Sequence, residues 1–270
     1  FLFVLELGMF GAALATAMGH GLGMMILLSH FVRKRGRIYF VWRFSLNAVF
    51  ASAKNGVPQS ISELSVAFVM IMFNHTLKAL ADSEEMKVSY LAIYSIVMYV
   101  GVVCFTILLS CAQGVQPVAS YNYGAGEMKR VRGIYAFGVG FATALGILVY
   151  GVFMSIDSIL VKLFLKSGQE MILEPTLEAM KVYFIGYIFL GFNIVSAIFF
   201  QSIQRPRSSF IITLSYNLVF VIILLFVLSY YYGIFGVWLS YPLSLVCSSV
   251  IVIAVIFYES RYGVLGKKTS

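Results

Sequence analysis

The sequence predicts an all-α membrane protein, a polytopic helical bundle, and three observations lead to this prediction. Hydrophobic residues make up 61% of the 270-residue chain and charged residues only 11%, whereas soluble domains average roughly 45 to 50% apolar and about 25% charged residues. The mean hydropathy is +0.94. The apolar residues form runs of at least about 20, the length that a helix needs to cross hydrocarbon. A soluble core cannot hide this much apolar surface.

The apolar runs predict seven spans and the remnant of an eighth. Residues 1–32 are too long for one span, and Gly8 and Gly11 offer a turn. We therefore expect the tail of one helix at residues 1–7 and a complete span at residues 12–32. The other spans are predicted at residues 56–80, 88–113, 133–165, 177–204, 208–230 and 233–258.

Positive charge is distributed unevenly between the connections. Fourteen of the 19 Lys and Arg residues lie in one set of alternate connections and five lie near the other. By the positive-inside rule the first set, and with it the C-terminus, faces the cytoplasm. This placement also explains the formal net charge of +8, because the basic residues form short clusters between apolar runs and not a continuous face for nucleic acid.

The segment at residues 33–55 mixes cations with aromatic residues such as Tyr39, Phe40 and Trp42. This composition is typical of a helix that lies in the headgroup region, and we interpret the segment as an interfacial linker between two helical bundles. A plain basic loop held near anionic lipid is the alternative.

Glu63 is the leading functional candidate, because it is the only acid well inside an apolar run. It follows Gly56 by seven residues, which is about 10 Å along a helix. A charge near the centre of a span costs about 2.5 to 3.5 kcal/mol, so such residues face a polar cavity or a partner. Burial favours the neutral acid, which lets the carboxyl alternate between carrying a proton and holding a cation. The alternative is a neutral acid that hydrogen-bonds a neighbouring helix.

The polar residues before Glu63 share its helical face. Asn55, Gln59 and Ser62 are spaced by four and three residues, and such a stripe on a spanning helix indicates a water-filled path. Other polar residues are candidates for lining the same cavity, although hydrogen bonding between helices explains them equally well or better. These are Tyr90, Tyr94, Thr106, Ser110, Gln113, Asn193, Ser196, Tyr216 and Asn217.

Several classes of function find no support in the sequence. The three histidines share no metal-ligand spacing, and no nucleophile elbow, phosphate-binding glycine loop or dinucleotide fingerprint is present. We therefore expect no enzyme and no cofactor. Gly138, Ala142 and Gly146 are spaced by four residues, a pattern that lets helix backbones approach closely, so we predict a packing role for them.

Two stretches of the sequence are distinctive, NGVPQSISEL at residues 55–64 and the more specific GVQPVASYNYGAGEMKRVR at residues 114–132. Both resemble a known family, the multidrug and toxic compound extrusion (MATE) exporters. GMFGAALATA at residues 8–17 and FFQSIQRPRSS at residues 199–209 are also similar to the family's sixth-helix entry and tenth-helix exit. The family-motif positions are Gly56, Pro58, Gln116, Pro117, Tyr121, Asn122, Tyr123 and Gly124.

The resemblance implies twelve helices in two six-helix lobes. Residues 1–32 are then the end of the N-terminal lobe, with the tail of helix five and helix six, and residues 33–55 are the cytoplasmic interfacial linker between the lobes. Residues 56–258 are the C-terminal lobe of six spans, and residues 259–270 are a cytoplasmic tail. The partner of this lobe, the missing N-terminal part, would lie outside the chain.

The resemblance also implies a function. Members exchange protons or sodium ions for small lipophilic, usually cationic compounds by alternating access, and a coupling glutamate on helix seven falls on Glu63. Some relatives add an acid on helix ten, where this chain has Leu190 and Asn193, so the coupling ion stays open. We expect a bacterial inner-membrane protein with membrane lipids as its surroundings. A lipid-linked sugar flippase of the same superfamily is the alternative, but the spans show no buried Arg or Lys for a pyrophosphate headgroup.

Overall fold

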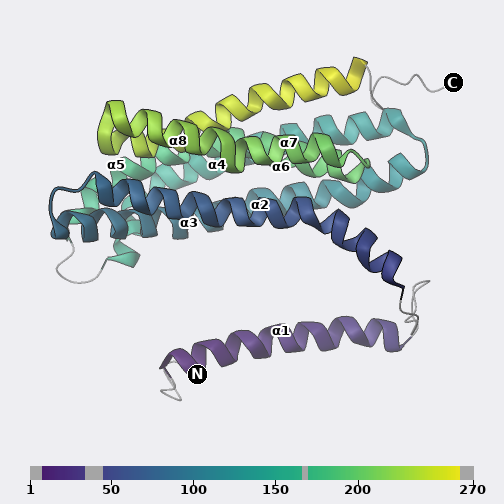
Figure 1. Cartoon of the computed structure of the whole chain (residues 1–270), viewed down its shortest axis with the longest axis horizontal. Helices are drawn as coiled ribbons and strands as arrows, with labels where there is room; N and C mark the ends of the chain where they lie inside the picture. The colour runs from purple at the N-terminus through teal and green to yellow at the C-terminus, as the bar shows by residue number, and fades with distance from the viewer. Residues whose placement is uncertain (1–7, 34–44, 166–169, 262–270) are drawn as a thin grey trace. The chain divides into compact units, whose positions relative to one another are not determined.

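The structure is a computed structural model that describes residues 8–33, 45–165 and 170–261. The chain divides into two compact units, Phe1–Lys54 and Asn55–Ser270. All regular elements of the described residues are helices (Figure 1), which confirms the predicted fold class. They are α1 (Gly8–Val32), α2 (Leu46–Ala79), α3 (Glu84–Gly124), α4 (Met128–Phe164), η1 (Glu170–Ile172), α5 (Leu173–Phe184), α6 (Tyr187–Ser202), α7 (Pro206–Leu214), η2 (Ser215–Val219) and α8 (Phe220–Arg261).

The first unit contains α1, which begins at Gly8 in a left-handed backbone conformation with φ +53°. Gly11, the second predicted turn residue, lies inside the helix, so the span starts earlier than expected. The predicted tail at residues 1–7 lies outside the described residues. Helix α2 begins at Leu46, within the segment predicted as the linker, of which residues 34–44 also lie outside the described part.

The α3–α4 pair is longer than the apolar runs predict. Ser83 caps α3 by accepting a hydrogen bond from the Met86 amide (3.2 Å), and Glu84 and Glu85 suit the positive end of the helix dipole. The helix then continues past the predicted end at residue 113, through Pro117, to Gly124. Its 41 residues span about 60 Å, about twice the thickness of hydrocarbon, so its polar ends project beyond the bilayer core.

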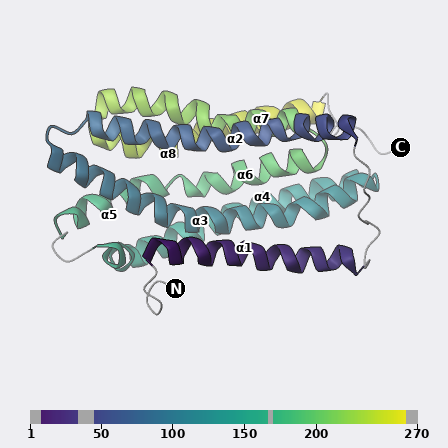
Figure 2. The same ribbon diagram turned by 60° about the horizontal axis from the view of Figure 1, so that its bottom comes forward.

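The core of the second unit lies where α3, α4 and α6 run side by side (Figures 1 and 2). Glycines set the distances between these helices. A Cβ added at Gly146 would lie 2.5 Å from the Tyr187 carbonyl oxygen, and one at Gly191 would lie 2.7 Å from that of Ala142. Gly138, Ala142 and Gly146 are all buried, so the predicted packing role of this small-residue stripe is confirmed.

The span predicted at residues 177–204 is a bent pair of helices, because α5 and α6 meet at 43°. Gly186 lies at the bend, where an added Cβ would be 2.8 Å from Leu245 Cδ1 and 3.0 Å from Pro242 Cα. The bend therefore coincides with the closest approach of α8. Stacking of Tyr183 on Tyr241, with ring centroids 4.4 Å apart, adds to the same contact.

The last helix, α8, folds back on itself at Gly233, which has φ 57° and ψ −134°. A Cβ at Gly236 would collide with the Leu228 carbonyl, so the two arms touch directly after the reversal. Five helices of the described residues are long and apolar enough to cross a membrane, or six when α5 and α6 form one span. The last of these spans, Pro206–Arg261, contains the reversal at Gly233 and therefore crosses twice. Counted in this way, the six spans become seven, which agrees with the number predicted.

The close approach of α4 and α6 gives a stability prediction for the full-length protein. Gly146→Ala should lower the thermal unfolding midpoint, because the added methyl group meets backbone atoms that cannot move away, and overpacking of this kind costs about 1 to 3 kcal/mol. Gly140→Ala on the same helix has open space at Cβ and should be neutral or stabilising, since alanine favours helix by about 1 kcal/mol. Equal midpoints for both variants would contradict the packing described here.

Candidate functional site

A polar junction joins α2 to the π-helical turn η2 in the second unit. The Asn217 side-chain amide donates a long hydrogen bond (3.4 Å) to the Ser62 hydroxyl. Tyr216 is 7% exposed, is hydrogen-bonded to Thr213 and lies close enough to Glu63 for electrostatic interaction. Two candidates predicted on α2 and two on the span at residues 208–230 therefore come together at one place.

The π-helical turn determines which side chains reach this junction. The Phe220 amide donates to the Ser215 carbonyl, a bond to the fifth residue back that inserts one extra residue into the turn. The Ser215 hydroxyl donates to the Ile211 carbonyl (2.7 Å). Single π-helical turns inside α-helices concentrate at functional sites, because they shift the following side chains around the helix. No sequence pattern predicted this turn.

Ser62 and Glu63 point in different directions from α2. Ser62 is buried inside the unit, whereas Glu63 is exposed on its surface. Asn217, the partner of Ser62, lies eleven residues after the start of α7 at Pro206, which is about 16 Å along a helix. The unit thus presents a carboxylate on its surface within the candidate membrane span Ser60–Ala79. Gly56, Pro58 and Gln59 lie in α2, in a part of the helix for which the structure describes the backbone alone.

The polar residues predicted on α6 serve packing against other helices. Asn193 is fully buried, and its amide donates to the Leu245 carbonyl (3.2 Å) and the Ser249 hydroxyl (3.0 Å) of α8. The Ser196 hydroxyl is 2.8 Å from the Tyr135 hydroxyl of α4. These bonds match interhelical hydrogen bonding, the alternative that the sequence left open.

The candidates on α3 divide between packing and exposure. Tyr94 is buried and stacks on Phe73 of α2, with ring centroids 5.4 Å apart, while Tyr90 is partly buried. Thr106, Ser110 and Gln113 are exposed, and the first two hydroxyls donate to carbonyls of their own helix. The structure therefore does not bring these residues to the junction around Glu63.

The longer family-like motif builds the hairpin between α3 and α4. The Glu127 amide donates to the Asn122 carbonyl (3.0 Å), and the Gly126 amide donates to that of Tyr123 (3.1 Å). Gly126 has φ +78°, a conformation that glycine adopts without strain. Pro117 and Tyr121 are exposed, whereas Gln116, Asn122 and Tyr123 are partly buried and Gly124 ends the helix. The motif thus has a clear structural role at this turn.

Sequence reasoning missed the buried acid Glu259, which is 3% exposed near the end of α8. Its Oε1 accepts a hydrogen bond from the Ser208 hydroxyl (2.8 Å), and its Oε2 lies 3.5 Å from Arg205 Nε. A negative charge is unfavourable at the C-terminal end of its own helix, but here it faces the N-terminal end of α7. The sequence feature that could have indicated this site is the position of an acidic residue near the C-terminal end of a helix, where its charge needs a compensating partner.

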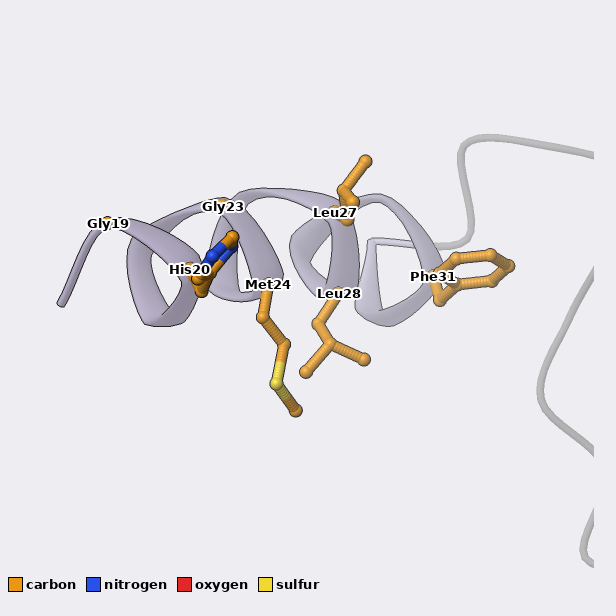
Figure 3. A pocket seen from close by; sticks show the side chains of 7 residues that line it. All are labelled: Gly19, His20, Gly23, Met24, Leu27, Leu28 and Phe31. Atoms are coloured by element: carbon orange, nitrogen blue, oxygen red, sulfur yellow. The ribbon is translucent and has the colours of Figure 1, made fainter. Parts of the chain in front are cut away.

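The first unit has a separate hollow of about 450 Å³ on one face of α1. Figure 3 shows the side chains around it, including His20, Met24 and Leu28. Gly19 and Gly23 also line the hollow, and the absence of a side chain at these two positions contributes to its volume. All of its walls belong to a single helix, so the hollow supplies no set of converging polar groups.

The Glu259 contact predicts an asymmetric pair of stability effects in the full-length protein. Arg205→Ala should cost less than the roughly 3 to 5 kcal/mol of a fully buried pair, because Arg205 is itself 38% exposed, but it should still lower the thermal midpoint because it removes the cation beside a buried carboxylate. Adding Glu259→Gln to Arg205→Ala should restore part of the thermal midpoint, since it removes the buried charge. Glu84→Ala, which breaks an exposed pair with Lys87, is the control and should cost less than about 1 kcal/mol. Absence of rescue in the double variant would contradict a charged Glu259.

Comparison with solved structures supports the same architecture. An outward-facing multidrug resistance MATE family transporter of the MOP superfamily matches with a TM-score of 0.85 and 19% identity. A MATE in complex with MaL6 matches with a TM-score of 0.83 and 18% identity. A MOP superfamily transporter from Pyrococcus furiosus, described as having a reversed polarity of its binding pocket, matches with a TM-score of 0.85 and 19% identity. Each match covers 99% of this chain but only 59 to 60% of the solved one. At such identities the likeness shows the fold.

The search of curated proteins found no match. The model of one protein family, MatE, matches residues 58–227, which is more than half of the 270-residue chain. The matched part begins within α2, contains Glu63 and the α3–α4 hairpin, and ends after η2. It therefore includes both sides of the polar junction. The chain belongs to the MatE family, the multidrug and toxic compound extrusion transporters.

Proposed function

We propose that this chain is part of a secondary active multidrug efflux antiporter, which exchanges protons or sodium ions for lipophilic, usually cationic compounds by alternating access. The observation that carries the proposal is the carboxylate of Glu63, exposed on the surface of the second unit within a candidate membrane span. A charge within a membrane span is costly against lipid, so we infer that the surface around Glu63 borders water or another part of the protein.

Polar groups lie in the same part of the unit as Glu63. Ser62 and Tyr216 carry hydroxyl oxygens and Asn217 an amide oxygen. Ser62 and Tyr216 are buried whereas Glu63 is exposed, so a proton or a hard cation held by the Glu63 carboxylate would sit at the surface of the unit. Transporters built from repeated lobes place such sites near the midplane, where one lobe rocks against the other. The chain spans about 59% of the length of its solved relatives, so the second half of the site would come from outside it.

Two features favour cationic substrates over the flippase alternative. Glu259 is the only charged side chain buried within the described residues, so the helices offer no buried Lys or Arg to hold a pyrophosphate. Asn193, near the position where some relatives carry a second acid, is engaged with α8. In the described part of this unit, exchange would therefore depend on one carboxylate within a membrane span, that of Glu63. We place the protein in a bacterial inner membrane with a cytoplasmic C-terminus.

Replacement of Glu63 tests the proposal in the full-length parent protein. Glu63→Gln should abolish ion-coupled efflux of a fluorescent lipophilic cation, because glutamine keeps the size and hydrogen bonding of the neutral acid but can neither release a proton nor hold a cation by charge. Expression and thermal stability should stay unchanged. Glu178→Gln on the exposed face of α5 is the control and should keep full efflux. Full efflux by Glu63→Gln would reject Glu63 as the coupling residue.

A further inference from the structure

A groove runs along the α3–α4 hairpin, between two helices that lie side by side (Figure 2). Its volume is about 620 Å³. Asn122 and Arg130 line it beside the turn that joins the helices, and Ser110 and Phe141 line it at the far end. None of its residues belongs to the polar junction around Glu63, so the groove is a separate feature of the second unit.

The shape of the groove arises from glycines and aromatic rings. Gly114 on α3 and Gly133 on α4 both line it, and a Cβ added at either position would meet no atom within 4 Å. Phe137 and Phe141 form one wall, stacked with ring centroids 5.9 Å apart, and they are 73% and 52% exposed. The hollow is therefore apolar along its length and open at the side.

The length of the groove fits one leaflet of a bilayer. Arg130 and Phe141 are separated by eleven residues of α4, which is about 16 Å along the helix and roughly half of the hydrocarbon thickness. The turn between α3 and α4, with its charged residues, lies at an end of α3 that projects beyond the bilayer core. A molecule that fills the groove would thus have its polar end among the charged residues of the turn and its apolar end toward the bilayer core.

The polar end of the groove is positively charged. Lys129, Arg130 and Arg132 lie in the first turns of α4, against the single acid Glu127. No ion pair involving Arg130 occurs within the described ranges, so its guanidinium is available to a phosphate, which it can bind in a bidentate manner. The complement is an amphiphile with an anionic head and an apolar tail.

We propose that the α3–α4 groove binds one anionic phospholipid of the surrounding bilayer. Its phosphate lies at Arg130 and Asn122, and an acyl chain follows the path from Gly133 past Phe137 to Phe141. The bilayer is the source, because a soluble anion would leave the apolar length of the groove unused. Basic pockets between helices at the membrane interface bind anionic headgroups for the same electrostatic reason.

Native mass spectrometry of the full-length parent protein in detergent tests the proposal, with phosphatidylglycerol and phosphatidylcholine of identical acyl chains as probes. The wild type should retain one phosphatidylglycerol in preference to phosphatidylcholine. Arg130→Ala should weaken phosphatidylglycerol binding about fivefold. Lys129→Ala should change it less than about twofold, because Lys129 is exposed but does not line the groove.

A second pair of variants tests the hollow itself. Gly133→Leu fills the groove and should weaken the binding of both lipids, whereas Gly140→Leu, on α4 but outside the lining, should leave binding unchanged. Size-exclusion profiles and thermal midpoints verify that the variants are folded. Equal losses for Arg130→Ala and Lys129→Ala would overturn the proposal in favour of diffuse charge attraction. No preference for phosphatidylglycerol in the wild type would also overturn it, because another part of the protein would then cover the groove.

Discussion

Hydrocarbon offers polar groups no partner, and the structure of the second unit follows from this constraint. Main-chain groups are satisfied inside helices, and hydroxyls such as those of Ser215 and Ser249 bond to carbonyls one turn back in their own helix. The helices then approach through glycines, as Gly146 and Gly191 do between α4 and α6. Two carboxylates depart from this pattern in different ways. Glu259 is buried beside Arg205, whereas Glu63 lies on the surface within a candidate membrane span.

These two acids connect the architecture to the proposed function. Glu259 joins the end of α8 to the start of α7, and from there the nine residues of α7 lead to the π-helical turn η2. That turn directs Asn217 toward Ser62 and places Tyr216 near Glu63. The position of the junction thus depends on packing at the far end of α7 as well as on α2. We infer that the first acid has a structural role and the second a functional one.

The sequence predicted the features that depend on composition and spacing. The membrane fold, the number of spans and the packing stripe at Gly138, Ala142 and Gly146 follow from runs of apolar or small residues, and all three are confirmed. Features that arise from contacts between distant segments could not be predicted. The 43° bend between α5 and α6, the π-helical turn and the burial of Glu259 depend on which helices lie opposite, and single-sequence periodicity carries no such information. The direction of Glu63 was open for the same reason.

The central claim is ion-coupled export, and the most direct measurement uses cells that carry the full-length parent gene. Efflux of a fluorescent lipophilic cation would be followed while the proton gradient and the sodium gradient are collapsed separately. The account predicts that efflux stops when one of the two gradients is collapsed and continues when the other is, which would establish antiport and identify the ion. Absence of efflux under either gradient would contradict the account and favour transport of a lipid-linked sugar.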